Sequence, residues 1–248
     1  MKIITLNTWG GRVHKELMDF LSKNQGVDIF CFQEIYHRAT HVHVEQGGID
    51  PNLTLFDDME KVLPDHKGYF RPHYIETYGL AVFIKNGLRV ELEDEYFVHR
   101  HKGYIPEGAV GNHARNVQVI ILKTKNGKLN IFNFHGLWNG GGKVDSEDRL
   151  NQSKKLTEYI KQFEGAKILC GDFNLEPQTE SIKMIENLPM RNLIKEYGIT
   201  STRTSYYTKD VRFADYMFIN DQVKVVDFQV LAGEVSDHFA LKLEIDIP

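Results

Sequence analysis

The sequence of 248 residues predicts an α/β fold with two stacked mixed β-sheets flanked by helices. Three observations predict it. Apolar runs of strand length alternate with amphipathic helical stretches along the chain. Neighbouring strand-like runs joined by short turns occur in both halves, which favours hairpins over a purely parallel doubly wound sheet. No Pro/Gly/Ser-rich linker or shift in composition divides the chain, so we expect residues 1–248 to form a single domain.

Local patterns place the elements of the first half. Leu17, Phe20 and Leu21 share one helical face, and the pair Asn126-Gly127 between two apolar runs is a strong hairpin signal. Residues 36–50 are expected to be irregular. Helices are expected near 13–24 and 53–62, and strands at the N-terminus and at 28–32, 79–85, 88–98, 116–124 and 128–135.

The second half begins with the best helical pattern of the chain, over residues 145–163. Ser146 is suited to cap this helix, and its inward face is apolar. Most of that face comes from Leu150, Leu156, Tyr159, Ile160 and Phe163. Later elements are expected as a strand at 167–170, a helix near 178–188, and strands at 214–219, 223–231 and 239–245.

Composition bounds the class of protein. Hydrophobic residues make up 42% and charged residues 26%, which is typical of a soluble globular protein. Cys31 and Cys170 lie in apolar runs, so we expect both to be buried thiols.

The N-terminus turns polar too early for a signal peptide, and no apolar run is long enough to span a bilayer; we therefore expect a cytoplasmic protein. A net charge of −4 excludes a global basic field for nucleic acid, although a local basic cleft could still serve a nuclease.

Four scattered segments put a carboxylate, an Asn or a His at or near an apolar run, three of them directly after a predicted strand. Strands that end on hard oxygen ligands indicate one active site at a sheet edge, and ligands without Cys suit Mg²⁺ better than zinc. Each segment alone could be a turn or a helix cap as easily as part of an active site. The prediction therefore depends on the occurrence of all four in one chain. The segments are Leu6-Asn7-Thr8-Trp9, Phe32-Gln33-Glu34, Cys170-Gly171-Asp172-Phe173-Asn174 and Val235-Ser236-Asp237-His238.

Together with Asn133-Phe134-His135 and Ala214-Asp215-Tyr216, these segments resemble the endonuclease/exonuclease/phosphatase superfamily in order, spacing and context. The resemblance runs from Asn7 to His238, nearly the whole chain. It implies a four-layered α/β sandwich of the deoxyribonuclease I type. It also implies metal-dependent hydrolysis of a phosphoester.

Carried over residue by residue, the resemblance makes Glu34 the main metal ligand, with Asn7 and Asp237 nearby. The ion would be Mg²⁺, with Mn²⁺ as a substitute. Asp172 would hold and activate the attacking water, and Asn174 would help to hold that water and the phosphate. Asp172 and Asn174 lie two residues apart, so in an extended segment they point the same way.

The resemblance assigns the remaining site residues to phosphate binding and proton transfer. His238 would lie against the scissile phosphate, polarised by Asp215, because a buried carboxylate raises an imidazole pKa and fixes its tautomer. His135 could protonate the leaving oxygen, although a strand-end His bonded to backbone is the alternative. Arg115 matches an Arg that binds phosphate, and its alternative is a surface Arg at the start of a strand.

Two positions depart from the abasic-site endonucleases of this superfamily. Trp9 stands where those enzymes carry Asp, and Arg212 stands where they carry an aromatic wall. With His135, these departures argue against abasic-site specificity. Trp9 itself could stack on a substrate or pack under the sheet edge.

Three loops remain open to interpretation. The Gly-rich loop 136–146 contains Trp138, which either contacts substrate or packs locally, and its glycines would let it close over a substrate. The basic, aromatic loop 99–115 either approaches an anionic substrate or is a solvated hairpin loop. His37, His41 and His43 lack a fourth ligand, which favours an exposed loop over a metal site.

The leading hypothesis is a Mg²⁺-dependent phosphodiesterase, with DNA or RNA first among substrates. The alternative is a phosphodiesterase or phosphatase acting on a small or lipid-derived phosphoester, as in sphingomyelinases and inositol phosphatases. A non-catalytic binding module is the weakest hypothesis, because every expected position holds a chemically competent residue. The sequence indicates no protein partner.

Overall fold

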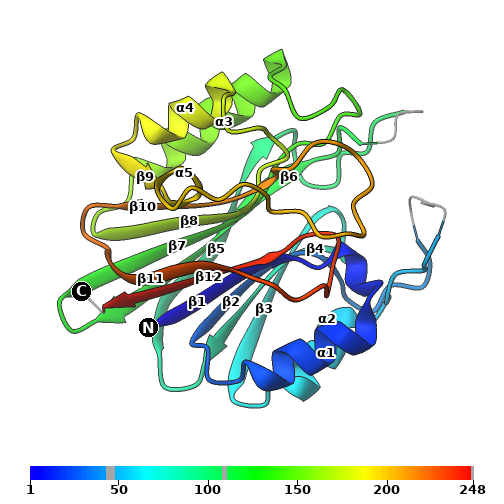
Figure 1. The fold of residues 1–248 in the computed structure, drawn as a ribbon, viewed down its shortest axis with the longest axis horizontal. Coiled ribbons are helices and arrows are strands. Elements are labelled where there is room, and N and C mark those ends of the chain that lie inside the picture. Colours follow the sequence, from blue (N-terminus) through cyan, green and yellow to red (C-terminus); the bar gives the residue numbers. More distant parts are fainter. Residues whose placement is uncertain (43–47, 108–110, 247–248) are drawn as a thin grey trace.

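The computed structural model describes residues 1–42, 48–107 and 111–246, and it contains two six-stranded sheets (Figure 1). The first sheet has the order β11-β12-β1-β2-β4-β3 and the second the order β5-β6-β7-β8-β10-β9. The first comprises β1 (Lys2–Asn7), β2 (Ile29–Tyr36), β3 (His66–Ile75), β4 (Tyr78–Lys85), β11 (Lys224–Leu231) and β12 (Ala240–Asp246). The second comprises β5 (Arg89–His99), β6 (Arg115–Thr124), β7 (Gly127–His135), β8 (Ala166–Asp172), β9 (Met190–Asn192) and β10 (Asp215–Asn220).

Both sheets are mixed, because β1 pairs with β2 and β7 pairs with β8 in parallel, whereas the other pairs are antiparallel. Figure 1 shows helices on the outer side of each sheet. The first sheet carries α1 (His14–Lys23) and α2 (Leu55–Val62), and the second carries α3 (Glu147–Ile160), α4 (Glu180–Glu186) and α5 (Leu193–Glu196). The predicted arrangement of two mixed sheets flanked by helices is confirmed.

Side-chain alternation along the strands builds the layers. In β2, Ile29 and Cys31 join the apolar cluster between the sheets, whereas Phe30 and Phe32 join the cluster under α1 and α2. Cys170 belongs to the same inter-sheet cluster, and both thiols are free and buried as expected. Every residue named here is 0% exposed, so β2 contributes to both layers of the core along its length.

Buried amides tie the two sheets together near one end of this core. Gln33 on β2 donates through Nε2 to Asn133 Oδ1 on β7, at 2.6 Å. Asn133 in turn donates through Nδ2 to the backbone carbonyls of Phe32 and Ala81, at 3.0 and 3.2 Å. Since unpaired buried amides are costly, this network fixes how the two sheets align.

Most predicted elements are present within a few residues of their expected bounds, but β3, β9 and α5 were not predicted. β3 contains Gly68 and Pro72, which argue against a central strand; it lies at the sheet edge, where Pro is tolerated. β2 continues past the predicted end to Tyr36. Ser146 caps α3 as predicted, accepting the backbone N–H of Arg149 at 3.3 Å. Among the described residues, no helix combines the length and apolarity needed to cross a membrane.

Candidate active site

The strand ends of the second sheet align three of the predicted site residues. His135 at the end of β7 is the register partner of Asp172 at the end of β8. Asp172 is also the partner of Asp215 at the start of β10. In the first sheet, Asn7 at the end of β1 pairs in register with Gln33 on β2. Both sheets therefore deliver polar side chains to one edge of the sandwich.

Two site residues adopt a left-handed backbone conformation. Glu34 has a φ of 61° and lies where the β2–β4 register shifts between Phe32 and Ile35, so a bulge turns its side chain out of the normal alternation. Asn174 has a φ of 54° just after β8. Such conformations cost about 1–3 kcal/mol each and concentrate at functional sites. Here they aim a carboxylate and an amide toward the shared edge.

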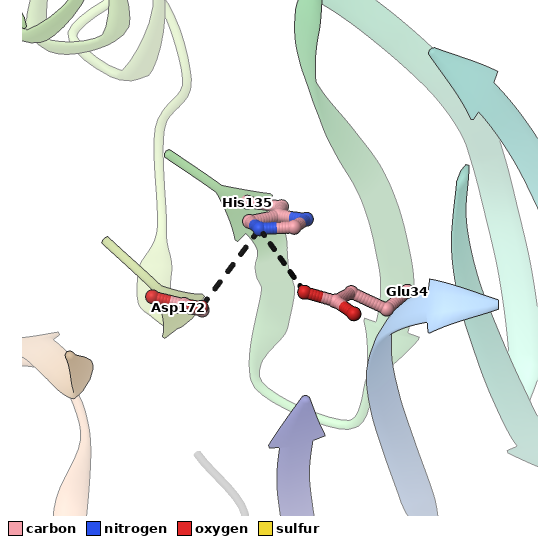
Figure 2. A group of neighbouring side chains, drawn as sticks. All are labelled: Glu34, His135 and Asp172. Carbon is pink, nitrogen blue, oxygen red and sulfur yellow. Dashed lines mark ion pairs between the residues drawn. The ribbon is translucent and has the colours of Figure 1, made fainter. Parts of the chain in front are cut away.

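The carboxylates of Glu34 and Asp172, from different sheets, are held together by Asn7. Its amide nitrogen donates to Glu34 Oε1 at 3.1 Å and to Asp172 Oδ2 at 2.9 Å. His135 completes the group, with Nε2 at 3.9 Å from Glu34 Oε1 and 3.8 Å from Asp172 Oδ2. Figure 2 shows the imidazole above both carboxylates. Asn174 is fixed by its N–H, which donates to Asp172 Oδ1 at 2.8 Å.

A second imidazole approaches Asp172 from the other side. His238 Nδ1 lies 2.8 Å from Asp215, whose Oδ2 also accepts from Thr202 Oγ1 at 2.8 Å. His238 Nε2 lies 3.7 Å from Asp172 Oδ2 and 3.6 Å from Asp237 Oδ1. Burial and a neighbouring guanidinium oppose the charged form, but the three carboxylates outweigh them and raise the pKa of His238. The predicted pairing of His238 with Asp215 is therefore present.

The other titratable groups of the site are shifted in different directions. Burial acts to raise the pKa of Asp172, but surrounding cations led by His238 hold it below its usual range, so Asp172 is ionised. Burial, and then Asp237, raise the pKa of Glu34. Burial and Arg115 lower the pKa of His135 well below its ordinary value. His135 is therefore neutral at pH 7 in the free protein, and a bound phosphate would favour its protonation.

The donor set fits a hard divalent cation. Glu34, His135 and Asp172 each offer one ligand atom, and these atoms lie within 4.8 Å of one another. Burial and then the neighbouring carboxylate of Asp237 raise the pKa of Glu34, and a cation bound between the carboxylates would relieve their repulsion. Asn7 turns its amide nitrogen to the carboxylates, and its Oδ1 accepts the N–H of Trp9 at 2.9 Å. Ligation by Asn7 would require its amide to rotate, so that role stays a prediction.

These groups line a cavity of about 280 Å³. Asn7 and Asp215 lie behind its wall as partners of the residues that face it. Trp9 and Trp138, the two aromatics singled out in the sequence, also line it. The predicted site residues that line it are Glu34, Arg115, His135, Asp172, Asn174, Asp237 and His238.

Sequence reasoning missed about half of the residues that line the cavity. Three of the tyrosines, Tyr36, Tyr74 and Tyr78, come from β2, β3 and β4, where aromatic residues are typical of a core. Lys143 lies in the Gly-rich loop 136–146, whose glycines were expected to let it close over a substrate, and Arg203 lies in a segment without a motif. Arg203 lies three residues before the pair Tyr206-Tyr207, and this basic residue close to aromatic ones was the one available signal. The missed lining residues are Arg12, Tyr36, Tyr74, Tyr78, His113, Lys143, Arg203, Tyr207 and Lys209.

The loops differ in how they meet the cavity. Loop 136–146 is anchored, since Leu137 N–H donates to Gln152 Oε1 at 2.9 Å and Asn112 N–H to Trp138 O at 2.6 Å. In the loop 99–115, Arg100 lies 3.8 Å from Asp148, and the end of the loop that lines the cavity contributes Gly111, His113 and Arg115.

His37 and His41, the two histidines of 36–50 that the structure describes, do not line the cavity. His37 Nε2 lies 3.9 Å from Asp57 Oδ2, and its ring packs against Phe56 and Phe70. His41 Nδ1 lies 3.1 Å from Thr40 Oγ1. His43 lies outside the described residues.

Comparisons with known proteins agree with the fold. The model of the endonuclease/exonuclease/phosphatase family matches residues 4–238. An endonuclease/exonuclease/phosphatase from Bacteroides vulgatus superposes with a TM-score of 0.77 at 18% identity, over 100% of this chain and 98% of that one. A mannosyl-6-phosphatase from Bacteroides thetaiotaomicron gives 0.71 at 17% identity, over 99% of both chains. The human nocturnin catalytic domain with bound sulfate gives 0.69 at 16% identity, over 100% of this chain and 93% of that one. No curated protein matches significantly.

Proposed function

The chain belongs to the endonuclease/exonuclease/phosphatase family, and we propose that it is a metal-dependent phosphoesterase in which Asp172 activates the attacking water. One observation carries the proposal. Ionised Asp172 lies within 4 Å of two imidazoles, with His135 Nε2 at 3.8 Å and His238 Nε2 at 3.7 Å. A nucleophile-orienting carboxylate between two potential proton donors is the arrangement that in-line displacement at phosphorus needs.

The side chains divide the reaction between them. Asp172 would accept a hydrogen bond and then the proton from water as the water oxygen bonds to phosphorus. His238, made cationic by its carboxylate partners, would donate to a phosphoryl oxygen that gains charge. His135 would give a proton to the leaving oxygen as its bond to phosphorus breaks. Asn174 and Arg115 would hold phosphoryl oxygens by hydrogen bonds.

Glu34 and Asp237 would hold Mg²⁺, or Mn²⁺ in its place, with Asn7 beside them. When bound, such a cation neutralises negative charge on the phosphoryl group and orients it for attack. The carboxylates of Glu34 and Asp237 would supply the hard oxygen ligands that both ions prefer. In this proposal Asp215 acts only through His238, as a positioning residue.

For the substrate, we favour the small phosphoester over nucleic acid, which the sequence favoured. The basic side chains at the start of loop 99–115 are matched by acids, with Arg100 near Asp148 and Lys102 Nζ at 3.6 Å from Glu95. Those pairs weaken any attraction for a polynucleotide backbone. Basic side chains also line the cavity itself, and its volume lies near the lower end of roughly 300–1,000 Å³ for small-molecule pockets.

The test is turnover by the purified protein with Mg²⁺ and with EDTA. The panel would contain single- and double-stranded DNA, RNA, sphingomyelin, inositol phosphates, sugar phosphates and p-nitrophenyl esters. We expect metal-dependent hydrolysis that falls roughly 10²–10⁴-fold in Asp172→Asn, which keeps the Oδ1 acceptor for Asn174. Asp227→Asn, at an exposed position of β11, is the matched control. Equal activity in EDTA and in the Asp172→Asn variant would refute the proposal, and metal-dependent cleavage of polynucleotide alone would restore the nuclease hypothesis.

A further inference from the structure

Two buried cations line the cavity without a role in the mechanism above. Lys143 comes from the loop between β7 and α3, and Arg203 comes from the segment between α5 and β10. Only 3% of Lys143 and 6% of Arg203 are exposed. Lys143 Nζ and Arg203 Nε are buried atoms with no hydrogen-bond partner among the described residues. Buried polar atoms without a partner are costly, so both side chains are arranged for an anion that enters the cavity.

The backbone around Lys143 is held in place by hydrogen bonds. Lys143 O accepts the N–H of Glu176 at 2.9 Å. Arg149, which is 1% exposed, donates to Val144 O at 2.5 Å and to Leu137 O at 3.2 Å. Burial lowers the pKa of Lys143 to about 8, although Asp172 favours its charge. The loop therefore presents a fixed cation that still needs an anion to complete its coordination.

Arg203 is fixed from three sides. Its Nη1 donates to Asp237 Oδ2 at 2.8 Å and contacts His238 Nε2. Its backbone forms an isolated antiparallel bridge with that of His238. Its guanidinium lies over the Tyr207 ring at 4.1 Å, and Lys143 Nζ lies 5.6 Å from the centroid of the same ring. One aromatic platform thus orients both cations beside the carboxylates of the site.

The charge of the cavity suits a dianion. Five Lys and Arg side chains line it, against the three carboxylates of Glu34, Asp172 and Asp237. A bound divalent cation would leave still more positive charge to be matched. A phosphodiester brings one negative charge, whereas a phosphomonoester brings up to two, together with a third non-bridging oxygen.

We propose that Lys143 and Arg203, oriented by Tyr207, form a phosphate clamp that selects phosphomonoesters over phosphodiesters. The clamp would bind non-bridging oxygens of a terminal phosphate. In a diester, the second ester group would stand where a monoester presents one of these oxygens to the two cations. The inference rests on the proposed function. In that reaction the water oxygen bonds to phosphorus, the bond to the leaving oxygen breaks, and one water proton passes to Asp172. The leaving oxygen takes a proton from His135, so the products are an alcohol and inorganic phosphate.

The test compares p-nitrophenyl phosphate with methyl p-nitrophenyl phosphate, which share a leaving group and differ by one methyl group on phosphate. In Lys143→Met and Arg203→Met we expect kcat/KM for the monoester to fall roughly ten- to hundredfold more than for the diester. Lys155→Met, at an exposed position of α3, is the matched control and should leave kcat/KM for both esters unchanged. Thermal melts would show that each variant is folded.

Binding of inorganic phosphate, measured by calorimetry, separates the clamp from the chemistry. We expect roughly tenfold or more weaker phosphate binding in both clamp variants than in the wild type and the control. Equal losses on both esters, or unchanged phosphate binding, would overturn the clamp while leaving the phosphoesterase proposal intact. Weaker phosphate binding in a protein that hydrolyses neither ester would support the clamp and reject the proposed function.

Discussion

Replacing Asp215 by Asn tests the electrostatic design of the site, because it removes one negative charge and little volume. In the structure, His238 Nδ1 lies 2.8 Å from both Asp215 oxygens, and both side chains are buried. An opposite charge at this distance shifts a pKa by about 1–3 units. At 1.36 kcal/mol per unit, the charge is worth roughly 1.4–4 kcal/mol to the cationic imidazole. The hydroxyl of Thr202 can still donate to the amide oxygen of the new side chain, so the local packing should persist.

The assay is an NMR titration of the imidazole Cε1–H signals in EDTA, with the signal of His238 assigned by its loss in His238→Gln. Because Asp215 raises the pKa of His238, Asp215→Asn should move the midpoint to lower pH. If the cationic form acts on the phosphate, the alkaline limb of kcat/KM should move the same way. Asp57→Asn, opposite His37 at 3.9 Å, is the matched control and should leave His238 unchanged. A midpoint for His238 that does not move in Asp215→Asn would refute the reasoning.

Three further predictions concern stability, each read from urea unfolding. Gly136→Ala should cost about 1–3 kcal/mol, because an added Cβ would meet Phe173 O at 2.3 Å; a cost near zero would show that the backbone yields. Ser146→Ala should cost about 1 kcal/mol by leaving Arg149 N–H uncapped, and an unchanged midpoint would rule the cap out as a stabiliser. Burial lowers the pKa of His73 well below 6.5, so only the unfolded chain binds this proton as the pH falls below about 6.5. The unfolding free energy should therefore drop there by up to about 1.4 kcal/mol per pH unit, and His73→Gln should flatten that slope.

The strand-end residues could be predicted because local pattern and topology agree there. His135 and Asp172 each close an apolar run, and the runs pair in parallel, so their ends meet at one sheet edge. Glu34 was predicted to follow its strand, although a bulge within β2 aims it. The position of such a bulge depends on pairing with β4, which a single strand does not reveal.

The rest of the site depends on contacts between segments far apart in the chain. The backbone around Lys143 is held by the N–H of Glu176, which donates to Lys143 O, and by Arg149, which donates to Val144 O. No local pattern in a Gly-rich loop predicts a buried ammonium. Arg203 reaches the cavity because its segment bridges to His238, 35 residues later. β3 was missed for a related reason. Its Pro72 reads as a strand breaker until the edge position in the sheet is known.

The division of the site between two sheets explains why polar side chains persist in the core beneath it. Glu34 comes from the first sheet and Asp172 from the second, so the distance between them depends on how the sheets pack. An apolar interface would allow small slips, because hydrophobic contact is not directional. Gln33 and Asn133 join the sheets by a 2.6 Å hydrogen bond, and the Asn7 amide spans the two carboxylates. Hydrogen bonds that are costly to break therefore set the spacing between the proposed metal ligand and the proposed base.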